Sequence, residues 1–282
     1  MPEGHTLHRL ARDLNAAFAG RPVRVSSPQG RFADSAALLD GRVVEGAEAW
    51  GKHLVVDLGD DRLVHVHLGL YGGFAVHPAV AEVPDPVGQV RLRLVSDDDR
   101  APAYADLRGA TACELLSAEG RDAVLARLGP DPLRADADPD RAWQRVRRSR
   151  VAIGALLMDQ SVLAGVGNVY RAEVLFRHRM HPLRPGGTLR AGQFAALWDD
   201  LVVLMAEGVE TGRIDTVRPE HTPEAMGRDA RADDHGGEVY VYRRQQQPCH
   251  VCGASVRTAE LAGRNLFWCP RCQPVFRSRA RG

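Results

Sequence analysis

The first half of the chain reads as one amphipathic helix followed by many short strands. Four apolar residues recur at helical spacing: Leu7, Leu10, Leu14 and Phe18. They predict a helix over residues 3–19 that ends at Gly20. From residue 22 to 116, short segments alternate apolar and polar positions between glycine and acidic turns, and residues 53–58 and 62–68 are predicted to pair as a hairpin. Strands at this spacing favour an antiparallel sandwich or barrel.

The second half changes to a helical pattern. Three segments carry it: residues 142–160, 168–179 and 191–210. The segment SVLAGVG (161–167) is too rich in glycine for a helix, and the proline- and aspartate-rich residues 128–140 are predicted to be a linker. Residues 211–238 are polar without any period and are interpreted as a mobile loop. Residues 239–282 are predicted to be a short, strand-rich unit around a group of cysteines.

Composition limits the class of protein. The chain has 282 residues, of which 44% are hydrophobic and 26% charged, as in ordinary globular proteins of one or two domains. No apolar run approaches the roughly 20 residues that a membrane helix needs. The amino end, MPEGHTLHRL, shows no apolar stretch of a secretory signal. We therefore expect a cytoplasmic protein with no membrane partner.

Four of the five cysteines form two pairs near the carboxyl end. They are Cys249 and Cys252, then Cys269 and Cys272, with 16 residues between the pairs. This spacing is typical of a four-cysteine zinc site, in which each pair places two thiolates on one tight turn. Four sulfur ligands close the tetrahedron, so the expected zinc ion is structural. A redox CxxC pair would not need a second copy at this distance, and Cys113 stands apart from the cluster.

The charge is unevenly distributed. The formal net charge is +1, but residues 241–282 carry eight arginines against one acid, Glu260, which is a formal +7. Residues 141–150 add five arginines and no acid. Two such patches fit a surface that binds a polyanion, although a solvated charged face would also explain either patch alone. Arg264 is expected to be exposed at the tip of a hairpin that bridges the cysteine pairs, where it suits a phosphate.

Three further positions carry candidate chemistry. Of 37 basic residues only Lys52 is a lysine, and lysine can exchange a proton where arginine cannot, although drift at a surface position would also leave one lysine. Removal of Met1 would expose the secondary amine of Pro2, a Schiff-base nucleophile, with Glu3 beside it for proton transfer. Asn168 follows a glycine turn and is predicted to cap a helix whose amino end binds phosphate.

Taken together, these motifs resemble the formamidopyrimidine-DNA glycosylase and endonuclease VIII family of base-excision repair enzymes. The matching segments run through nearly the whole chain: Pro2-Glu3-Gly4, Gly51-Lys52, HLGLYG (67–72), LGPDPL (128–133), AGVGNVYRAEVLF (164–176) and GRNLFWCPRCQ (263–273). Within the family, the sequence is more similar to the endonuclease VIII branch of actinobacterial type.

The resemblance implies an α+β fold in three domains. Residues 1–131 would form a catalytic β-sandwich with a leading helix. Residues 132–238 would form a helix–two-turns–helix domain with the mobile loop, and residues 239–282 a zinc-ribbon finger. Damaged DNA would be the partner of a monomeric bacterial enzyme that associates with the nucleoid when it is bound to DNA.

The resemblance also implies roles for individual residues. Pro2 would attack C1′ of the damaged nucleotide, Glu3 would protonate the sugar, and Lys52 would donate a proton. The DNA-binding residues would be Leu70, Tyr71, Arg108, Arg127, Asn168 and Arg264. Of these, Leu70 and Tyr71 would wedge into the space of the flipped base, Arg108 would read the orphaned base, and Arg264 would also assist the second elimination. The activity would be that of a DNA glycosylase and abasic-site lyase that works by β- and δ-elimination.

Three departures from the family pattern bear on the substrate. His5-Thr6 replaces the usual proline and acid, so a second carboxylate near the sugar is absent. The segment ADLRGAT (105–111) lacks the aromatic wedge of the purine-directed branch, and residues 211–238 do not match a loop that caps 8-oxoguanine. The last two favour oxidised pyrimidines. Two other hypotheses remain: a non-catalytic, zinc-dependent binder of damaged DNA, and a zinc-ribbon transcription factor, which would leave the β-rich first half unexplained.

Overall fold

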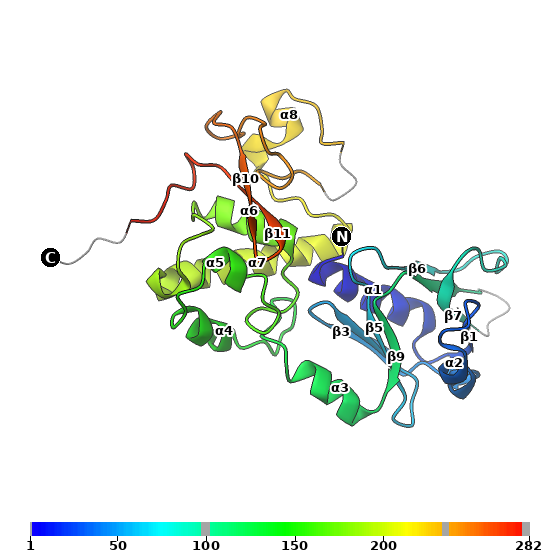
Figure 1. Ribbon diagram of the computed structural model, residues 1–282. Coiled ribbons are helices and arrows are strands. Elements are labelled where there is room, and N and C mark those ends of the chain that lie inside the picture. Colours follow the sequence, from blue (N-terminus) through cyan, green and yellow to red (C-terminus); the bar gives the residue numbers. More distant parts are fainter. Residues whose placement is uncertain (1, 97–101, 233–236, 278–282) are drawn as a thin grey trace. The chain divides into compact units, whose positions relative to one another are not determined.

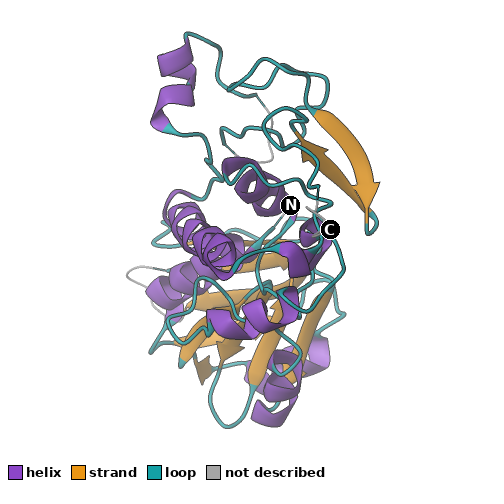
Figure 2. Cartoon of the chain, turned by 90° about the vertical axis from the view of Figure 1, so that its left-hand side faces the viewer, coloured by secondary structure: helices purple, strands orange, loops and turns teal. Residues whose placement is uncertain are grey.

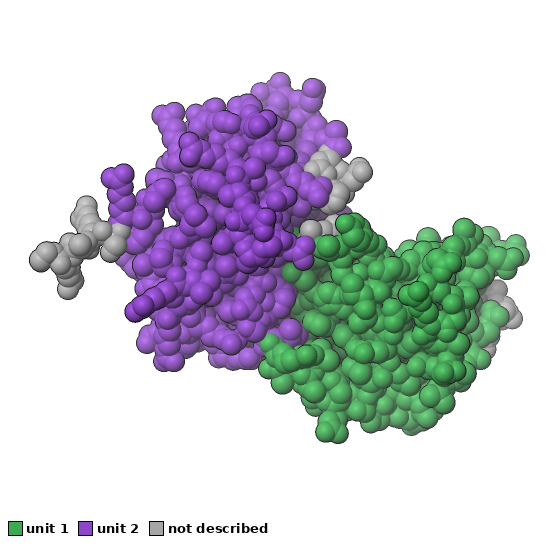
Figure 3. Space-filling model, in the orientation of Figure 1, with its two compact units in different colours: residues 1–127 green, residues 128–282 purple. Residues whose placement is uncertain are grey.

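A computed structural model describes residues 2–96, 102–232 and 237–277 (Figure 1). The chain divides into two compact units, residues 1–127 and 128–282, which are coloured separately in Figure 3. The division falls where the predicted linker begins. The second unit contains both the helical region and the cysteine-rich region, and a finger that folds as a third domain stays a prediction.

The first unit is built mainly of strands. Its described elements are α1 (Gly4–Phe18), β1 (Pro22–Ser26), α2 (Ala33–Leu39), β2 (Arg42–Val43), β3 (Gly46–Trp50), β4 (His53–Asp57), β5 (Leu63–His67), β6 (Gly73–His77), β7 (Val90–Ser96), β8 (Tyr104–Arg108), β9 (Ala112–Leu116) and α3 (Ala118–Leu125). The short helices α2 and α3 were not predicted, because neither is long enough to show a clear helical period.

The strands form two antiparallel sheets. One has the order β2-β1-β7-β8-β6 and the other the order β3-β4-β5-β9. Strands β4 and β5 pair from Leu54 with Val66 to Asp57 with Leu63, which confirms the predicted hairpin. Apolar side chains of both sheets and of α1 join one core, so the predicted sandwich with a leading helix is confirmed.

Helix α1 buries one apolar face. Leu7, Leu14 and Phe18 are almost fully buried, and the helix packs against β3, β4 and β6. Burying each such side chain stabilises the fold by roughly 1.5–3 kcal/mol. The chain leaves the helix through Gly20, whose φ of 73° favours glycine.

The described elements of the second unit are mainly helices, and Figure 2 colours all helices purple and all strands orange. The unit's described elements are α4 (Pro139–Val146), α5 (Ile153–Leu156), α6 (Asn168–Arg177), η1 (Gly186–Thr188), α7 (Ala191–Thr211), η2 (Pro219–His221), α8 (Pro223–Met226), β10 (Arg257–Leu261) and β11 (Arg264–Trp268). Helices α6 and α7 confirm the predictions for residues 168–179 and 191–210. No helix in the described part of the chain is long and apolar enough to cross a membrane.

The predicted helix over residues 142–160 is wrong, because two short helices replace it. Asp138 caps α4 by accepting from the amide of Asp140 at 3.0 Å, with Pro139 at the first helical position. Between the two helices, Ala152 is extended and forms an antiparallel bridge with Pro185. This pairing requires a β conformation that a continuous helix cannot supply.

The aperiodic segment 211–238 contains more local structure than its pattern indicates. Helices η2 and α8 lie within it, and Thr222 caps α8 by accepting from the amide of Ala225 at 3.3 Å. Proline begins both short helices. Such single turns are too short to produce a hydrophobic period, which explains why the sequence predicted only a loop.

Candidate functional site

Pro2 and Glu3 lie at the amino end of α1. Glu3 is completely buried, and its carbonyl accepts from the amide of Thr6 at 2.9 Å. This helix end carries the partial positive charge of the helix dipole. Burial lowers the pKa of His5 to about 4, so its imidazole is neutral at pH 7. Met1 lies outside the described residues, and the nucleophilic role of Pro2 stays a prediction.

Lys52 lies in a two-residue turn between β3 and β4. Trp50 pairs with His53 across this turn, and Gly51 takes the positive φ of 59° that the first turn position requires. The sequence signal Gly51-Lys52 thus corresponds to a tight hairpin turn, which holds the lysine backbone at the end of a rigid sheet.

Leu70 and Tyr71 lie in the turn between β5 and β6. The side chain of Tyr71 is 93% exposed and that of Leu70 is 38% exposed, which is unusual for large apolar residues. A Cβ at Gly72 would lie 2.3 Å from the carbonyl oxygen of Leu68, so only glycine fits there. The turn therefore presents two apolar side chains on a sharply bent backbone.

Of the two remaining candidates in the first unit, Arg127 is exposed and Arg108 is half-buried. Arg108 ends β8, where its guanidinium donates to Asp106 at 2.9 Å and to the carbonyl of Val87 at 3.1 Å. Arg127 follows α3 and lies close enough to His53 for its charge to lower the pKa of that ring. Arg108 is thus held in place by its own unit, whereas a role in reading a base stays a prediction.

Asn168 is the first residue of α6, but it does not cap the helix. Gly167 occupies the cap position, so the predicted cap is wrong. The side-chain oxygen of Asn168 instead accepts from the guanidinium of Arg171, one turn later in the same helix. Asn168 is only 5% exposed, and its contact with phosphate stays a prediction.

Arg171 connects three elements of the second unit. It is fully buried and, besides Asn168, its guanidinium donates to the carbonyl of Asn265 at 2.8 Å and to that of Gly154 at 3.4 Å. Asn265 is the neighbour of Arg264 in β11. Sequence reasoning missed this residue, because none of its distant partners leaves a local pattern.

Glu173 is a second buried hub that the sequence did not reveal. Its carboxylate accepts from the amides of Tyr240, Val241 and Tyr242 at 2.6, 2.9 and 2.8 Å, and from the hydroxyl of Thr216 at 2.7 Å. These bonds tie α6 to the bent segment at residues 240–242 that leads into the finger. Four donors compensate the burial of the carboxylate.

The finger hairpin presents Arg264 at its tip. Strands β10 and β11 pair from Arg257 with Trp268 to Leu261 with Arg264. The connecting residues Ala262 and Gly263 both have positive φ, 52° and 70°, as in a type I′ turn. Arg264 is exposed, as the sequence predicted.

The two arginine patches differ in how many of their arginines are exposed. All five arginines of residues 141–150 are exposed. In the second patch, five described arginines are exposed: Arg243, Arg257, Arg264, Arg271 and Arg277. Arg244 is buried and donates to the carbonyls of Tyr240 at 2.6 Å and Pro248 at 2.9 Å, so it is structural. Arg279 and Arg281 lie outside the described residues.

The four cysteines of the finger come together as the spacing predicted. Their sulfur atoms all lie within 4.8 Å of one another, and the pairs Cys249–Cys272 and Cys252–Cys269 are 3.9 and 3.4 Å apart. A tetrahedron with Zn–S bonds of about 2.3 Å has edges of about 3.8 Å, so these thiols fit one zinc ion. Cys113 lies on β9 in the first unit.

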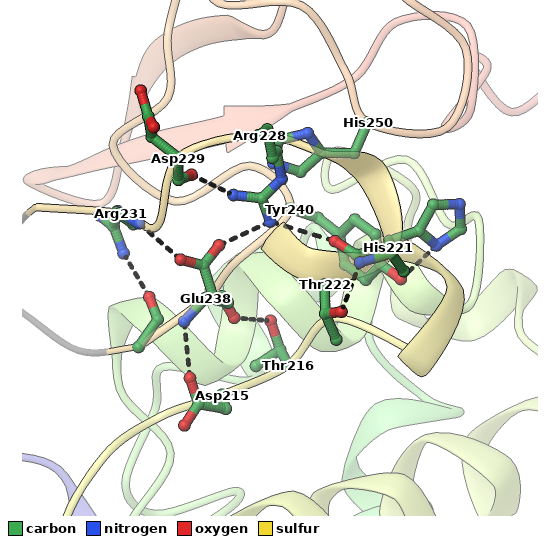
Figure 4. A network of polar contacts seen from close by, with 12 residues as sticks. Asp215, Thr216, His221, Thr222, Arg228, Asp229, Arg231, Glu238, Tyr240 and His250 are labelled. Atoms are coloured by element: carbon green, nitrogen blue, oxygen red, sulfur yellow. Dashed lines mark hydrogen bonds and ion pairs between the residues drawn. The ribbon is translucent and has the colours of Figure 1, made fainter.

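A polar network holds the segment before the finger (Figure 4). Glu238 accepts from the guanidinium of Arg228 and from the amide of Arg231, both at 2.6 Å. Its own amide donates to Asp215 at 2.7 Å. Tyr240 accepts through its hydroxyl from the amide of Arg218 at 2.9 Å. The described part of residues 211–238 is thus folded back on itself.

Comparison with protein families accounts for nearly the whole chain. Residues 1–113 match the formamidopyrimidine-DNA glycosylase N-terminal domain, and residues 128–219 match the formamidopyrimidine-DNA glycosylase H2TH domain. Residues 246–275 match the zinc finger found in formamidopyrimidine-DNA glycosylase and isoleucyl-tRNA synthetase. The third match supports one structural zinc ion in the four-cysteine site.

Individual proteins give the same result. Endonuclease 8 1 of Mycobacterium tuberculosis is 54% identical over 97% of this chain and its own full length. Formamidopyrimidine-DNA glycosylase of Roseiflexus sp. is 35% identical over 90% of this chain and 88% of its own length. A Lactococcus lactis formamidopyrimidine-DNA glycosylase in complex with DNA containing an abasic site has a TM-score of 0.76, with 25% identity over 97% of this chain and all of that one. The chain therefore belongs to the formamidopyrimidine-DNA glycosylase and endonuclease 8 family, whose members are DNA glycosylases with abasic-site lyase activity.

Proposed function

We propose that the protein removes oxidised pyrimidines from DNA through an imine on Pro2 and then cleaves the strand by β- and δ-elimination. Family membership supports base-excision repair of damaged bases. The observation that carries the finer proposal is the start of the chain, where Pro2 precedes a fully buried Glu3 at the positive end of α1. A nearby helix amino end disfavours a cation, so it favours the free amine.

The chemistry begins once Met1 has been removed. The lone pair of the Pro2 nitrogen attacks C1′, the glycosidic bond breaks, and Lys52 gives a proton to the departing base. The proton that the Pro2 nitrogen carried passes to the Glu3 carboxylate, and Glu3 then gives a proton to the ring oxygen of the sugar as the ring opens, which leaves a cationic imine. The imine acidifies C2′, so loss of that proton expels the 3′ phosphate. Loss of a second proton expels the 5′ phosphate, and water then releases the sugar fragment from Pro2.

Each of the two units would supply some of the residues that contact DNA. Tyr71 and Leu70 are exposed apolar side chains on a bent turn, which suits insertion into the stack where a base has been flipped out. Arg127 is an exposed arginine that suits a phosphate, and Arg108 would read the base opposite the lesion. In the second unit, Arg264 and Asn168 would bind the backbone beside the lesion.

The preference for pyrimidines rests on two features of the chain. After Arg108 the chain continues Gly109-Ala110-Thr111, without an aromatic wedge. The segment 211–238 is folded back by Glu238, and two single-turn helices lie in its described residues 211–232, which differs from a long capping loop. We also propose that the enzyme is a cytoplasmic monomer that associates with the nucleoid through DNA.

Borohydride trapping tests the proposal against a protein that only binds damaged DNA. The protein is mixed with DNA carrying an abasic site and reduced, so that an imine becomes a stable covalent bond. Wild-type protein should be trapped, whereas Pro2→Gly should lose most trapping and base excision but keep nearly all DNA binding. Full activity in protein shown by mass spectrometry to retain Met1 would exclude Pro2 as the nucleophile.

A further inference from the structure

A chain of hydrogen-bonded side chains crosses the sheet β3-β4-β5-β9 close to Lys52. His53 is on β4, His65 on β5 and Glu114 on β9, and His65 is registered opposite Glu114. The Nδ1 atom of His53 lies 2.9 Å from Nε2 of His65. The Nδ1 atom of His65 lies 2.8 Å from Oε1 of Glu114.

The carboxylate at the outer end sets the position of each proton along the chain. An ionised carboxylate can only accept, so His65 must carry its hydrogen on Nδ1. In a neutral His65 the Nε2 atom is then an acceptor, so His53 donates from its own Nδ1. The Nε2 atom of His53 is left with a lone pair. Glu114 thereby fixes the tautomer of a ring two strands away.

His67 provides a contrast within the same cluster. Its ring centre lies 5.0 Å from that of His53, but its Nδ1 lies 2.9 Å from the hydroxyl of Thr111 and 3.2 Å from the amide nitrogen of Gly69. The hydroxyl can accept from a protonated Nδ1 and the amide can donate to a bare one, so these partners do not select one tautomer, whereas the carboxylate of Glu114 selects one for His65.

The charges around His53 keep it neutral. Burial lowers its pKa to about 3, with further contributions from His65, His67, Arg127 and Lys52. Burial also lowers the pKa of His67, followed by His65 and Lys52. Lys52 directly precedes His53 at the start of β4, and its positive charge is among the contributions that lower the pKa of both rings. With its pKa at about 3, the His53 ring adds no competing positive charge at neutral pH.

We propose that Glu114, His65 and His53 are positioning residues for Lys52, and that the fixed lone pair on His53 helps to keep the lysine protonated as the acid of base excision. This inference rests on the proposed role of Lys52. A bare imidazole nitrogen near an ammonium is attractive, whereas an N–H group there is repulsive. Loss of the hydrogen bonds from Glu114 through His65 to His53 would let His53 adopt the other tautomer and would lower the pKa of Lys52.

Variants at Glu114 test the chain without disturbing the core, because the Glu114 side chain is 51% exposed. Glu114→Ala removes the acceptor, and Glu114→Gln keeps a carbonyl oxygen that can still accept from His65. Glu119→Ala, which removes an exposed carboxylate from the nearby helix α3, is the matched control. The readouts are the pH profile of single-turnover base excision and the ¹⁵N spectra of the histidine rings in the whole enzyme.

In wild-type protein the spectra should show His53 and His65 protonated on Nδ1. Glu114→Ala should convert His53 to the Nε2–H form. It should also move the alkaline limb of excision to lower pH by roughly 0.5–1 unit, because a proton donor is lost as pH rises through its pKa. Glu114→Gln should restore most of the wild-type profile, and cleavage of preformed abasic sites should not shift.

Each contrary result has a separate meaning. A wild-type His53 protonated on Nε2 would show that the chain does not set the tautomer. A tautomer change in Glu114→Ala with an unmoved alkaline limb would show that the chain does not act on Lys52. Undiminished excision by Lys52→Arg would instead overturn the proposed role of the lysine, whatever the spectra show.

Discussion

The two units hold their candidate residues in different ways. In the first unit, Lys52 and Tyr71 lie on short turns between strands, and the turn geometry fixes their backbone. In the second unit, Asn168 and the neighbour of Arg264 are joined by the buried Arg171. A turn holds a residue through neighbours that are close in sequence. A buried charged side chain holds a residue through partners that are far apart in sequence.

This difference has an energetic consequence. An exposed turn residue such as Tyr71, which is 93% exposed, can be replaced with little effect on folding, because few contacts are lost. A buried charged residue with several partners cannot be replaced in this way, because its removal leaves the hydrogen-bonding groups of those partners unsatisfied. Substitutions in the first unit should therefore separate chemistry from stability. Those in the second should change DNA binding and local folding together.

Lys52→Arg should give the largest effect. It preserves the positive charge but removes a readily exchanged proton, and a general acid contributes roughly 10²–10⁴-fold to rate. We expect excision of an oxidised pyrimidine to fall by about 100-fold or more in a single-turnover assay, with gel-shift affinity nearly unchanged. Cleavage at preformed abasic sites should be partly retained. A wild-type excision rate would mean that this lysine persists only by drift.

Replacement of any one zinc ligand should give the next largest effect, confined to the second unit. Metal-binding energy is folding energy in so small a unit, so Cys249→Ala should unfold the finger and weaken DNA binding while the β-sandwich survives. Metal content, gel shifts and near-ultraviolet circular dichroism measure this. Cys113→Ala is the control and should keep its zinc. Normal binding by Cys249→Ala after chelation would contradict the prediction.

Prediction from the sequence succeeded where the signal was local. The hairpin of β4 and β5, helices α6 and α7, and the cysteine pairs each carry their own period or spacing. It failed at residues 147–152, where pairing of Ala152 with Pro185 overrides helical propensity. It also placed Asn168 at a cap that Gly167 occupies, because the competing partner Arg171 is identified only in three dimensions.

The candidate site residues show the same difference between local signals in the sequence and partners that only the fold brings together. Lys52 was found because it is the single lysine, and HLGLYG because it matches the family pattern; the structure shows that glycines in both segments mark turns of defined geometry. Glu173, Arg171 and Glu114 were not found, since each gains its meaning from partners on other elements. A lone acid or arginine in a sequence is most often a solvated side chain, so its type alone indicates nothing about a role.

Arg264→Ala should give the smallest effect and is the most direct test of whether the finger hairpin contacts phosphate. Loss of one such contact should weaken binding to all sequences alike and reduce the salt dependence of log K by about 0.9. Arg257→Ala, at the other end of the same hairpin and equally exposed, is the matched control and should leave the slope closer to wild type. Salt titrations by gel shift measure both. An equal loss for the two variants would show that the hairpin contributes a diffuse positive field, since only a defined contact depends on which arginine lies at the tip.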